Sequence, residues 1–516
     1  MSNSHKKPSK YQSIKVLIYT YKAFPIATIM KKLYLFLLVP LTLIGQTQMG
    51  SNIFPELQNE QAGWYVSMSA DGHTVAVGGQ AEDGDNNHFA RARVYSFNGQ
   101  DWIQKGQPLR LLNYSGDYSA RCRVSLSGDG NTLVISSPNQ GMLFNGNVMI
   151  FQYKDSNWEL LGNYFIGSGN NLLGYGISLS SNGNIIAMAS PGPNVFNEFG
   201  FITVRQFDGT LWNEIGQKIN GYSNSEGSYS LEQVVLSLSN DGTTLVIGTP
   251  FSGENGNYGG EVRVYQYSGG LWVQMGESIF SDEGKNFGSS VSINGDGNTI
   301  AIGRISDSEM GYVRVFNYEN GQWLQKGVKL YGDEANDHFG ASVAISDDGN
   351  ILAIGAPRSD IASLPQTGQA KIFKFIGNAW SQVGNNIIGL NPNDLFGQDV
   401  SLSAHGNILA VASPFFDNSP YNDSGNVNVY DLSDILSTNI NEMKSFSLYP
   451  NPASDQLNIV LGSGFQLVEV NIYNSVGQLV KREQKELIDI SELAAGTYYI
   501  QIISPQFTNT KIFIKN

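Results

Sequence analysis

The residues of this chain best suited to bind another molecule are carboxylate and aromatic side chains and one arginine. They fall into three groups along the sequence. They are Asp83 and Asp85, then Asp333, Asp337 and Arg358, and finally Phe415, Phe416, Asp417, Tyr421 and Asp423. Aromatic faces flanked by carboxylates suit sugar rings, which have apolar faces and polar edges. These residues therefore predict a glycan-binding site, with the stretch PFFDNSPYNDSG (414–425) as its main part.

The same chain offers little for catalysis. General acid–base chemistry needs paired groups within reach of each other, and zinc needs clustered His or Cys residues. The five histidines are scattered, and the one cysteine, Cys122, lies in RCRVSLS, where a related stretch has Ala341. We predict no catalytic residue, no metal and no cofactor, and expect Cys122 to be a small buried residue. The alternative is an enzyme acting on extracellular polysaccharide, since carboxylates from different repeats could meet around a central channel.

Composition and charge narrow the class of protein. The 516 residues include 58 Gly, 25 Tyr and 26 Phe, and only 15% are charged, which is typical of an ordered all-β protein. One cysteine excludes an intrachain disulfide framework. The net charge of −14 argues against a nucleic-acid partner, because phosphates require a basic surface.

The N-terminal region reads as an export leader. Residues 30–45, MKKLYLFLLVPLTLIG, combine a start Met, two lysines, an apolar run and a small residue before Gln46, as in a secretory signal peptide. The apolar run is too short to span a membrane, so we expect no transmembrane segment in the mature chain. Residues 1–29 are expected to be an upstream extension, which leaves both Met1 and Met30 as possible starts.

The elements that must position the candidate site are repeats. One stretch recurs seven times, as in SLSNDGTTLVIGTP: an alternating strand, an Asp-Gly or Asn-Gly turn, and a second strand. The turn glycines are Gly72, Gly130, Gly183, Gly242, Gly297, Gly349 and Gly406, spaced by 52 to 59 residues. A second hairpin follows, with the pattern Trp-x-x-x-Gly in six of the repeats. Four antiparallel strands per repeat predict the blades of a β-propeller, here seven.

The last repeat lacks a fourth strand, and the N-terminus supplies a match for it. TQMGSNIF (47–54) resembles VQMGESIF (273–280), with Gln46 at the Trp position and Gly50 at the Gly position. An unpaired sheet edge is a liability, so residues 47–54 are expected to pair with residues 426–432 and close the ring. We therefore predict a seven-bladed propeller over residues 46–432.

One repeat carries a family signature. HFGASVAISDDGNILAIGAP (338–357) resembles an FG-GAP repeat, the blade of integrin-α-type propellers: Phe339-Gly340 opens it and Gly355-Ala356-Pro357 ends its second strand. The calcium loop of that family does not carry over, because its other ligand positions fall on Ala344, Ser346 and Leu352. We interpret the Asp-Gly pairs as turn residues.

The C-terminal region differs in pattern from the repeats. Residues 433–444 form a polar linker, and residues 445–516 alternate as strands of a small β-sandwich of the immunoglobulin-like kind. This region resembles the type A C-terminal sorting domain of the type IX secretion system, through Tyr449, Pro450, Asn451, Pro452, Gly477, Gly496 and Tyr498. The resemblance implies export across the outer membrane, to the cell surface or beyond, with the secretion machinery and a sortase that removes the tail as partners.

The expected geometry places the candidate binding residues together. The tight turns of each repeat lie on one face of a propeller, and the longer loops, including 414–425, lie on the other. Binding residues concentrate on loops held by a rigid scaffold. We therefore predict a monomeric, secreted or cell-surface propeller that binds an extracellular glycan or protein, whose identity the sequence leaves open.

Overall fold

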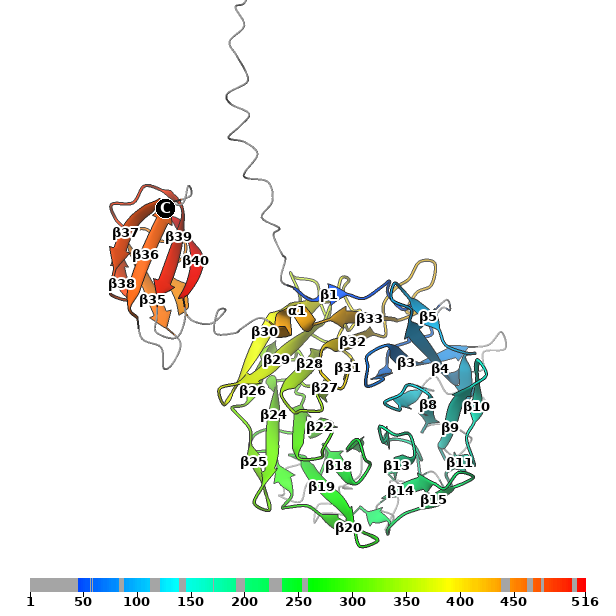
Figure 1. Cartoon of the computed structure of the whole chain (residues 1–516). Coiled ribbons are helices and arrows are strands. Elements are labelled where there is room, and N and C mark those ends of the chain that lie inside the picture. The colour runs from blue at the N-terminus through cyan, green and yellow to red at the C-terminus, as the bar shows by residue number, and fades with distance from the viewer. Residues whose placement is uncertain are drawn as a thin grey trace, which may run out of the picture. The chain divides into compact units, whose positions relative to one another are not determined.

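The computed structural model describes residues 45–55, 57, 59–82, 88–111, 121–138, 145–169, 171–191, 200–221, 234–252, 259–437, 446–461, 467–474, 478–503 and 508–516. Almost all regular structure in these ranges is β-strand. Residues 47–431 form seven antiparallel sheets of four or five strands in this part of the chain. Figure 1 shows these sheets following one another around a ring.

The first four sheets of the ring have five strands each. The first contains β2 (Tyr65–Met68), β3 (Thr74–Glu82), β4 (His88–Phe97), β5 (Trp102–Gln104) and β6 (Leu109–Leu111). The second contains β7 (Arg123–Leu126), β8 (Thr132–Ser137), β9 (Asn147–Lys154), β10 (Asn157–Leu160) and β11 (Phe165–Ile166). The third contains β12 (Ile177–Leu179), β13 (Ile185–Ser190), β14 (Phe201–Phe207), β15 (Trp212–Glu214) and β16 (Ile219–Asn220). The fourth contains β17 (Val235–Leu238), β18 (Thr244–Thr249), β19 (Glu261–Ser268), β20 (Leu271–Gln274) and β21 (Ile279–Phe280).

The remaining three sheets complete the ring. The fifth contains β22 (Phe287–Ile293), β23 (Thr299–Arg304), β24 (Met310–Glu319), β25 (Gln322–Gln325) and β26 (Leu330–Ala335). The sixth contains β27 (Ser342–Ile345), β28 (Ile351–Ala356), β29 (Gln369–Ile376) and β30 (Ala379–Ile388). The seventh contains β31 (Val400–Leu402), β32 (Ile408–Ser413), β33 (Asn426–Asp431) and β1 (Thr47–Gln48).

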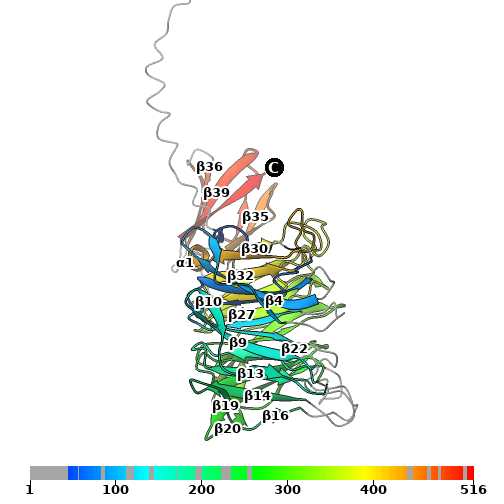
Figure 2. The same ribbon diagram turned by 90° about the vertical axis from the view of Figure 1, so that its right-hand side faces the viewer.

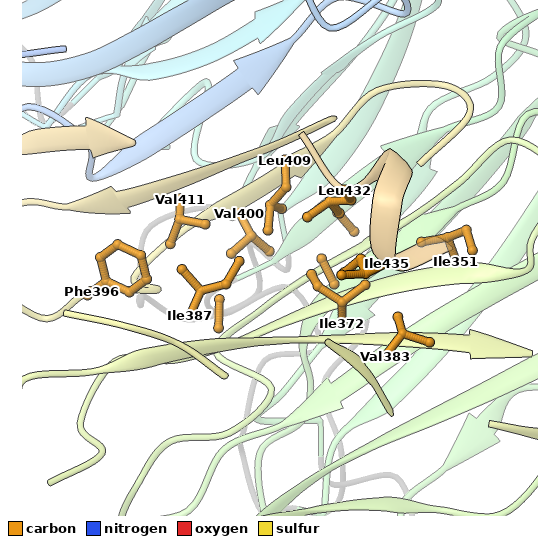
Figure 3. Packing of buried hydrophobic residues seen from close by; sticks show 13 residues of the cluster. Ile351, Ile372, Val383, Ile387, Phe396, Val400, Leu409, Val411, Leu432 and Ile435 are labelled. Carbon is orange, nitrogen blue, oxygen red and sulfur yellow. The ribbon is translucent and has the colours of Figure 1, made fainter. Parts of the chain in front are cut away.

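The burial of the second strand in each sheet explains how the sheets pack. All six residues of β8 (Thr132–Ser137) and of β18 (Thr244–Thr249) are buried. A strand buried on both faces reads as a continuous apolar run rather than as an alternation. The sheets therefore pack face to face around the ring, as the side view in Figure 2 shows. Figure 3 shows one such interface, where the sixth and seventh sheets bury Ile372, Ile387, Val400 and Leu409 together with Ile435 of helix α1 (Ser433–Ser437). Residues 433–437, expected in the linker, thus pack against this core.

The Asp-Gly turns repeat one hydrogen-bonded arrangement. In the first, the Ser69 hydroxyl lies 2.6 Å from an Asp71 carboxylate oxygen and accepts a 2.9 Å hydrogen bond from the backbone N–H of Thr74. Gly72 has a φ of 76°, a left-handed conformation that favours glycine. The Asp side chain closes the turn locally, as short polar side chains do in turns.

Backbone hydrogen bonds join the turns of successive sheets into a closed circle. We call the residues that make them the turn layer: Ala70, Gly128, Ser181, Asn240, Gly295, Asp347 and Ala404. Each N–H donates to the carbonyl oxygen of the next residue in this order, and the N–H of Ala404 donates to the carbonyl of Ala70 at 2.9 Å. The circle therefore leaves no gap between the last sheet and the first.

A second set of contacts circles the ring on the innermost strands, three residues before the turn layer. We call it the serine layer: Ser67, Ser125, Ser178, Ser237, Ser292, Ala344 and Ser401. Each serine hydroxyl accepts a hydrogen bond from a backbone N–H of the next sheet; the Ser67 hydroxyl, for example, accepts one of 2.9 Å from Leu126. Ala344 interrupts the series, because it has no hydroxyl to offer Leu402.

The N-terminal strand pairs with the last strand of the seventh sheet, as expected for residues 47–54 and 426–432. Thr47 pairs with Asp431 and Gln48 with Tyr430, and an isolated bridge joins Ile53 to Val427. In the other sheets a Trp indole N–H donates to the sheet before it, as Trp158 does to the carbonyl of Lys105 at 2.7 Å. The indole of Trp102 makes the equivalent 2.8 Å bond to the carbonyl of Met49, so residues 47–54 take the place of an outer strand.

Gln46 occupies the tryptophan position at this seam. Its side-chain amide donates to the carbonyl of Asn385 in the sixth sheet, much as the indoles donate elsewhere. The match between the N-terminal segment and the repeats therefore extends to the contacts of individual side chains.

The C-terminal region contains two antiparallel sheets of its own. One contains β34 (Phe446–Tyr449), β35 (Gln456–Leu461) and β38 (Leu487–Asp489). The other contains β36 (Glu469–Asn474), β37 (Leu479–Glu483), β39 (Gly496–Ile503) and β40 (Thr508–Lys515). Their buried side chains, such as Leu457, Ile472 and Phe513, form a single core.

Candidate functional site

A cavity of about 410 Å³ lies where the innermost strands of all seven sheets begin. We call it the central cavity. One residue from each sheet lines it at the equivalent position, two residues before the serine layer, and we call these residues the mouth layer: Tyr65, Arg123, Gly176, Val235, Ser290, Ser342 and Asp399. Unlike the serine layer, this layer differs in side-chain type from sheet to sheet.

Aromatic and cationic side chains cover one side of the central cavity. The Arg123 guanidinium carbon lies 4.5 Å from the ring centre of Tyr65 and 4.7 Å from that of Tyr175, which are cation–π distances. Trp64 lines the same cavity, and the guanidinium of Arg121 lies 3.4 Å from its ring centre. Three successive sheets therefore present a Tyr–Arg–Tyr stack, with a second Arg–Trp pair beside it.

Asp399 is the carboxylate of the mouth layer. It accepts hydrogen bonds from the backbone N–H of Val66 at 2.8 Å, from the Ser342 hydroxyl at 2.6 Å and from its neighbour Val400 at 3.0 Å. Burial raises the pKa of Asp399 to about 6, although these hydrogen bonds and the charge of Arg123 act in the opposite direction. The carboxyl group thus joins the sixth, seventh and first sheets and titrates near neutral pH.

The opposite wall of the central cavity carries a histidine. The Nε2 atom of His338 lies 2.7 Å from an Asp307 carboxylate oxygen, and Arg358 Nη1 lies 3.0 Å from the same oxygen. Burial lowers the pKa of His338, against the opposing effect of its hydrogen bond to Asp307. Of the predicted residues, Arg358 is thus held by an ion pair to Asp307, which also binds His338.

The predicted loop 414–425 forms a separate cavity of about 660 Å³. Phe415, Asp417 and Asp423 line it together with Asp394. The backbone N–H of Asp423 donates to Asp417 at 2.8 Å, so Asp417 also closes its own loop. Burial, aided by the charge of Asp417, raises the pKa of Asp394 to about 6, although hydrogen bonds from Asn391 act against the shift.

Two other residues of this loop have structural contacts. The ring of Phe416 stacks on Phe54 with ring centres 5.7 Å apart, beside the N-terminal seam. Tyr421 exchanges two backbone hydrogen bonds with Asn418, of 2.7 and 2.9 Å. The ring of Phe415 lies 5.6 Å, centre to centre, from that of Trp64, which lines the central cavity.

The second predicted group lies in a third cavity, of about 230 Å³, which Asp333, Asp337 and Arg358 line. Asp333 accepts a 2.5 Å ion pair from Lys371. Burial raises the pKa of Asp337, whose carboxylate nonetheless accepts backbone hydrogen bonds from Phe339 at 2.9 Å and Asp333 at 3.0 Å. Both carboxylates are thus engaged within the fold.

The structure therefore places six of the predicted residues at two cavities: Asp333, Asp337 and Arg358 at one, and Phe415, Asp417 and Asp423 at the other. Asp83 and Asp85 lie outside the described residues. Sequence reasoning missed the central cavity with its key residues Trp64, Tyr65, Arg123, Tyr175 and Asp399. The sequence did contain a signal for this cavity. When the seven repeats are aligned on the positions of the serine layer, the residue two positions earlier varies, for example from Tyr to Arg to Asp, while the strand around it repeats.

The sorting residues lie within the two C-terminal sheets. Tyr449, Pro450, Asn451 and Pro452 lead into a bridge between Ala453 and Lys515, and the Asn451 side chain accepts a 2.9 Å hydrogen bond from the N–H of Ile514. Gly496 opens β39, and the Tyr498 hydroxyl donates to the carbonyl of Ala494 at 2.8 Å. Gly477 lies outside the described residues.

Several other residue-level observations concern the expected chemistry. Cys122 is buried and free, and burial raises the pKa of its thiol. The described residues contain no group of His, Cys, Asp or Glu side chains that could hold a metal ion. In the same part of the chain, no helix has the length and apolar character needed to cross a membrane.

Comparison with known proteins identifies two segments of the chain. Residues 447–516 match the model of the secretion system C-terminal sorting domain, and residues 332–373 match that of the FG-GAP repeat. No curated protein matches the chain.

Two solved structures resemble the chain at low identity. One is a candidate 6-phosphogluconolactonase from Bacteroides uniformis ATCC 8492, 14% identical with a TM-score of 0.45, over 66% of this chain and 89% of that one. The other, a candidate of the same name from Bacteroides fragilis NCTC 9343, is 13% identical with a TM-score of 0.43, over 66% of this chain and 86% of that one. Neither likeness is high enough to support an argument about function.

The two matched segments agree with the resemblances drawn from Phe339-Gly340 and from Tyr449–Pro452. The chain is a protein of the FG-GAP type with a C-terminal sorting domain of the type IX secretion system, which indicates secretion to the cell surface or the extracellular space.

Proposed function

We propose that this secreted protein is a seven-bladed propeller, closed by its N-terminal strand, that binds an extracellular glycan in its central cavity. The seven sheets are the blades, and the closed circle of the turn layer supports that count. The C-terminal sheets are an immunoglobulin-like sandwich that the secretion system removes through its sortase. Residues 30–45 act as the signal peptide, residues 1–29 as an upstream extension, and the protein works as a monomer without a cofactor.

One observation carries the binding proposal. The central cavity collects the rings of Trp64, Tyr65 and Tyr175 at its wall, with the hydroxyl groups of Ser290 and Ser342 also lining it. Aromatic faces pack on the apolar faces of sugar rings, while the polar groups contact their hydroxyls. These residues lie on, or just before, short strands held by the serine layer, so the site is formed before the ligand arrives.

The predicted loop extends this site. Phe415 contacts Trp64 and also lines the neighbouring cavity with Asp417 and Asp423. A glycan longer than one sugar would therefore run from the central cavity over Phe415 to the loop 414–425. A protein ligand is the other partner class that this surface would accept.

The test is a glycan array probed with the full-length protein and with Tyr65→Ala, followed by mass spectrometry of the bound sugars. We expect one sugar class to bind with unchanged mass, and the variant to bind it about 3- to 10-fold more weakly, the loss expected for one aromatic contact. Equal binding by Tyr65→Ala, or no binding to any glycan, would contradict the proposal.

A second candidate function, cleavage of polysaccharide, is favoured by Asp399. A carboxyl group that keeps its proton near pH 6 in a cavity is suited to act as a general acid. The same mass spectra decide the matter, because cleavage would release shortened or unsaturated fragments.

A further inference from the structure

The central cavity differs in charge from the cavities around it. The loop cavity is lined by Asp394, Asp417 and Asp423, and the third cavity by Asp333, Glu334, Asp337 and Asp360 together with Arg358. The central cavity is lined by one carboxylate, Asp399, against Arg123 and the titratable His338. In a chain of net charge −14, the central cavity therefore has fewer carboxylates than either of these two cavities, and Arg123 faces the one that it has.

The environment of Arg123 leaves its hydrogen-bonding edge available. Tyr65 and Tyr175 cover the two neighbouring sides of the guanidinium at cation–π distance, and no acceptor within the described ranges binds its N–H groups. Guanidinium donors point outward in the plane of the group, so stacking on rings leaves them free. An arginine held in this way is prepared to bind a carboxylate with two parallel hydrogen bonds.

The nearby carboxylate does not take that place. Both oxygens of Asp399 accept hydrogen bonds from Val66, Val400 and Ser342, and no ion pair joins it to Arg123 within the described part of the chain. Salt screens charges over about 8 Å at physiological ionic strength. The acidic loops farther away therefore repel an anionic ligand less strongly than Arg123 attracts it at close contact.

We propose that the central cavity selects acidic sugars, with Arg123 binding the carboxylate of a uronic acid residue whose ring packs against Tyr65 or Tyr175. This inference rests on the proposed glycan binding and names its ligand class. Arg121, whose guanidinium covers Trp64 at the rim, adds a second positive charge along the path of the chain. A polymer of uronic acids would present its next carboxylate to that residue.

The experiment compares ligands that differ only in charge. Oligomers of galacturonate, glucuronate and mannuronate, and the methyl esters of each, are titrated into the full-length protein by calorimetry. We expect at least one uronate oligomer to bind about 10- to 100-fold more tightly than its methyl ester, because a charged hydrogen-bonded pair is lost on esterification. A sulfated galactan tests whether the anion must be a carboxylate.

Two substitutions assign the effect to one side chain. Arg123→Gln should lose the preference for the free acid, and Arg123→Lys should recover only part of it, since a lysine cannot form the planar pair. The control is Arg110→Gln, an exposed arginine of β6 with the same stacking on an aromatic ring, 5.7 Å from Phe89. It should bind as the unmodified protein does.

The outcomes separate this inference from the proposed function. If neutral glycans or the methyl esters bind as well as every uronate, or if Arg123→Gln keeps the preference, the acidic-sugar inference is wrong while glycan binding stands. Tighter binding of the sulfated galactan than of any uronate would also overturn the assignment to a carboxylate. If no saccharide of any charge binds, the proposed function itself fails.

Discussion

The serine layer and the mouth layer lie two residues apart on the same seven strands, yet they differ in every respect that matters for function. The serine layer repeats one residue in six of its seven positions and ties each sheet to the next. The mouth layer changes from Tyr65 to Arg123 to Asp399 and lines a cavity. A repeated contact is what a scaffold needs, whereas a set of different side chains at one level can recognise a particular molecule. The serine layer therefore serves the stability of the ring, whereas the mouth layer supplies the varied side chains that recognition needs, among them Asp399, which also joins three sheets.

The largest expected effect comes from removing a scaffold contact outside both layers. Trp212 is 1% exposed, donates to the carbonyl of Leu161 at 2.9 Å and lies 5.2 Å from the ring centre of Phe207. Trp212→Ala should lower the free energy of unfolding by about 3–5 kcal/mol, through the cavity that it opens. Chemical denaturation measures this loss. A loss below 1 kcal/mol would show that the interlocked tryptophans do not hold the ring together.

The mouth layer should make the stability of the protein depend on pH through Asp399. The native pKa of Asp399 is about 6, above the ordinary value of 3.8, so the native state binds the proton more tightly than the unfolded state. Stability should therefore rise as the pH falls from about 6 to about 4, by up to about 3 kcal/mol for this group. Asp399→Asn should remove that contribution. Parallel pH profiles for the two proteins would contradict the assignment.

A single serine of the repeated layer should matter modestly. Ser178→Ala removes the acceptor of the 2.9 Å hydrogen bond from the N–H of Leu238 and leaves that donor facing a methyl group. We expect a loss of about 1 kcal/mol in the free energy of unfolding. Glycan binding should not change, because Ser178 lies below the cavity. A matched loss of binding would show that the two layers are not independent.

The smallest expected effect is an increase in the free energy of unfolding. Ala344 is the only position of the serine layer without a hydroxyl, and it stands where Leu402 would find an acceptor. Ala344→Ser should complete the series and raise the free energy of unfolding by about 0.5–1 kcal/mol. Ala344→Val, which fills the space without a hydroxyl, is the control. If the valine variant gains as much, packing rather than hydrogen bonding accounts for the change.

The sequence predicted the scaffold well because the scaffold is repetitive. The Asp-Gly turns, the Trp-x-x-x-Gly strands and the pairing of Thr47 with the final strand could all be recognised by comparing one repeat with another. The pattern placed Gln46 at a tryptophan position, and the Gln46 amide indeed bonds to the neighbouring sheet. Strand and turn chemistry are local, so local patterns reveal them.

The candidate site was harder to predict for a physical reason. Trp64, Arg123 and Asp399 lie far apart in the sequence, at the start of the first, second and seventh sheets, and only the closure of the ring brings them to one cavity. Residues clustered in the sequence instead favoured loops such as 414–425, where Phe415 contacts Trp64 of the central cavity. Carboxylates such as Asp333 and Asp337 looked available in the sequence, but the fold engages them with Lys371 and with backbone N–H groups.

One matched pair on β7 tests the account most directly. The melting temperature, and the affinity for whichever uronate oligomer the unmodified protein binds most tightly, are measured for two variants. Arg123→Gln changes the mouth layer, and Ser125→Ala changes the serine layer, where the Ser125 hydroxyl accepts a 3.0 Å hydrogen bond from Leu179. The account predicts that Arg123→Gln loses binding, while Ser125→Ala binds normally and melts earlier. Normal binding by Arg123→Gln, or an equal loss of binding in both variants, would contradict the separation of recognition from stability.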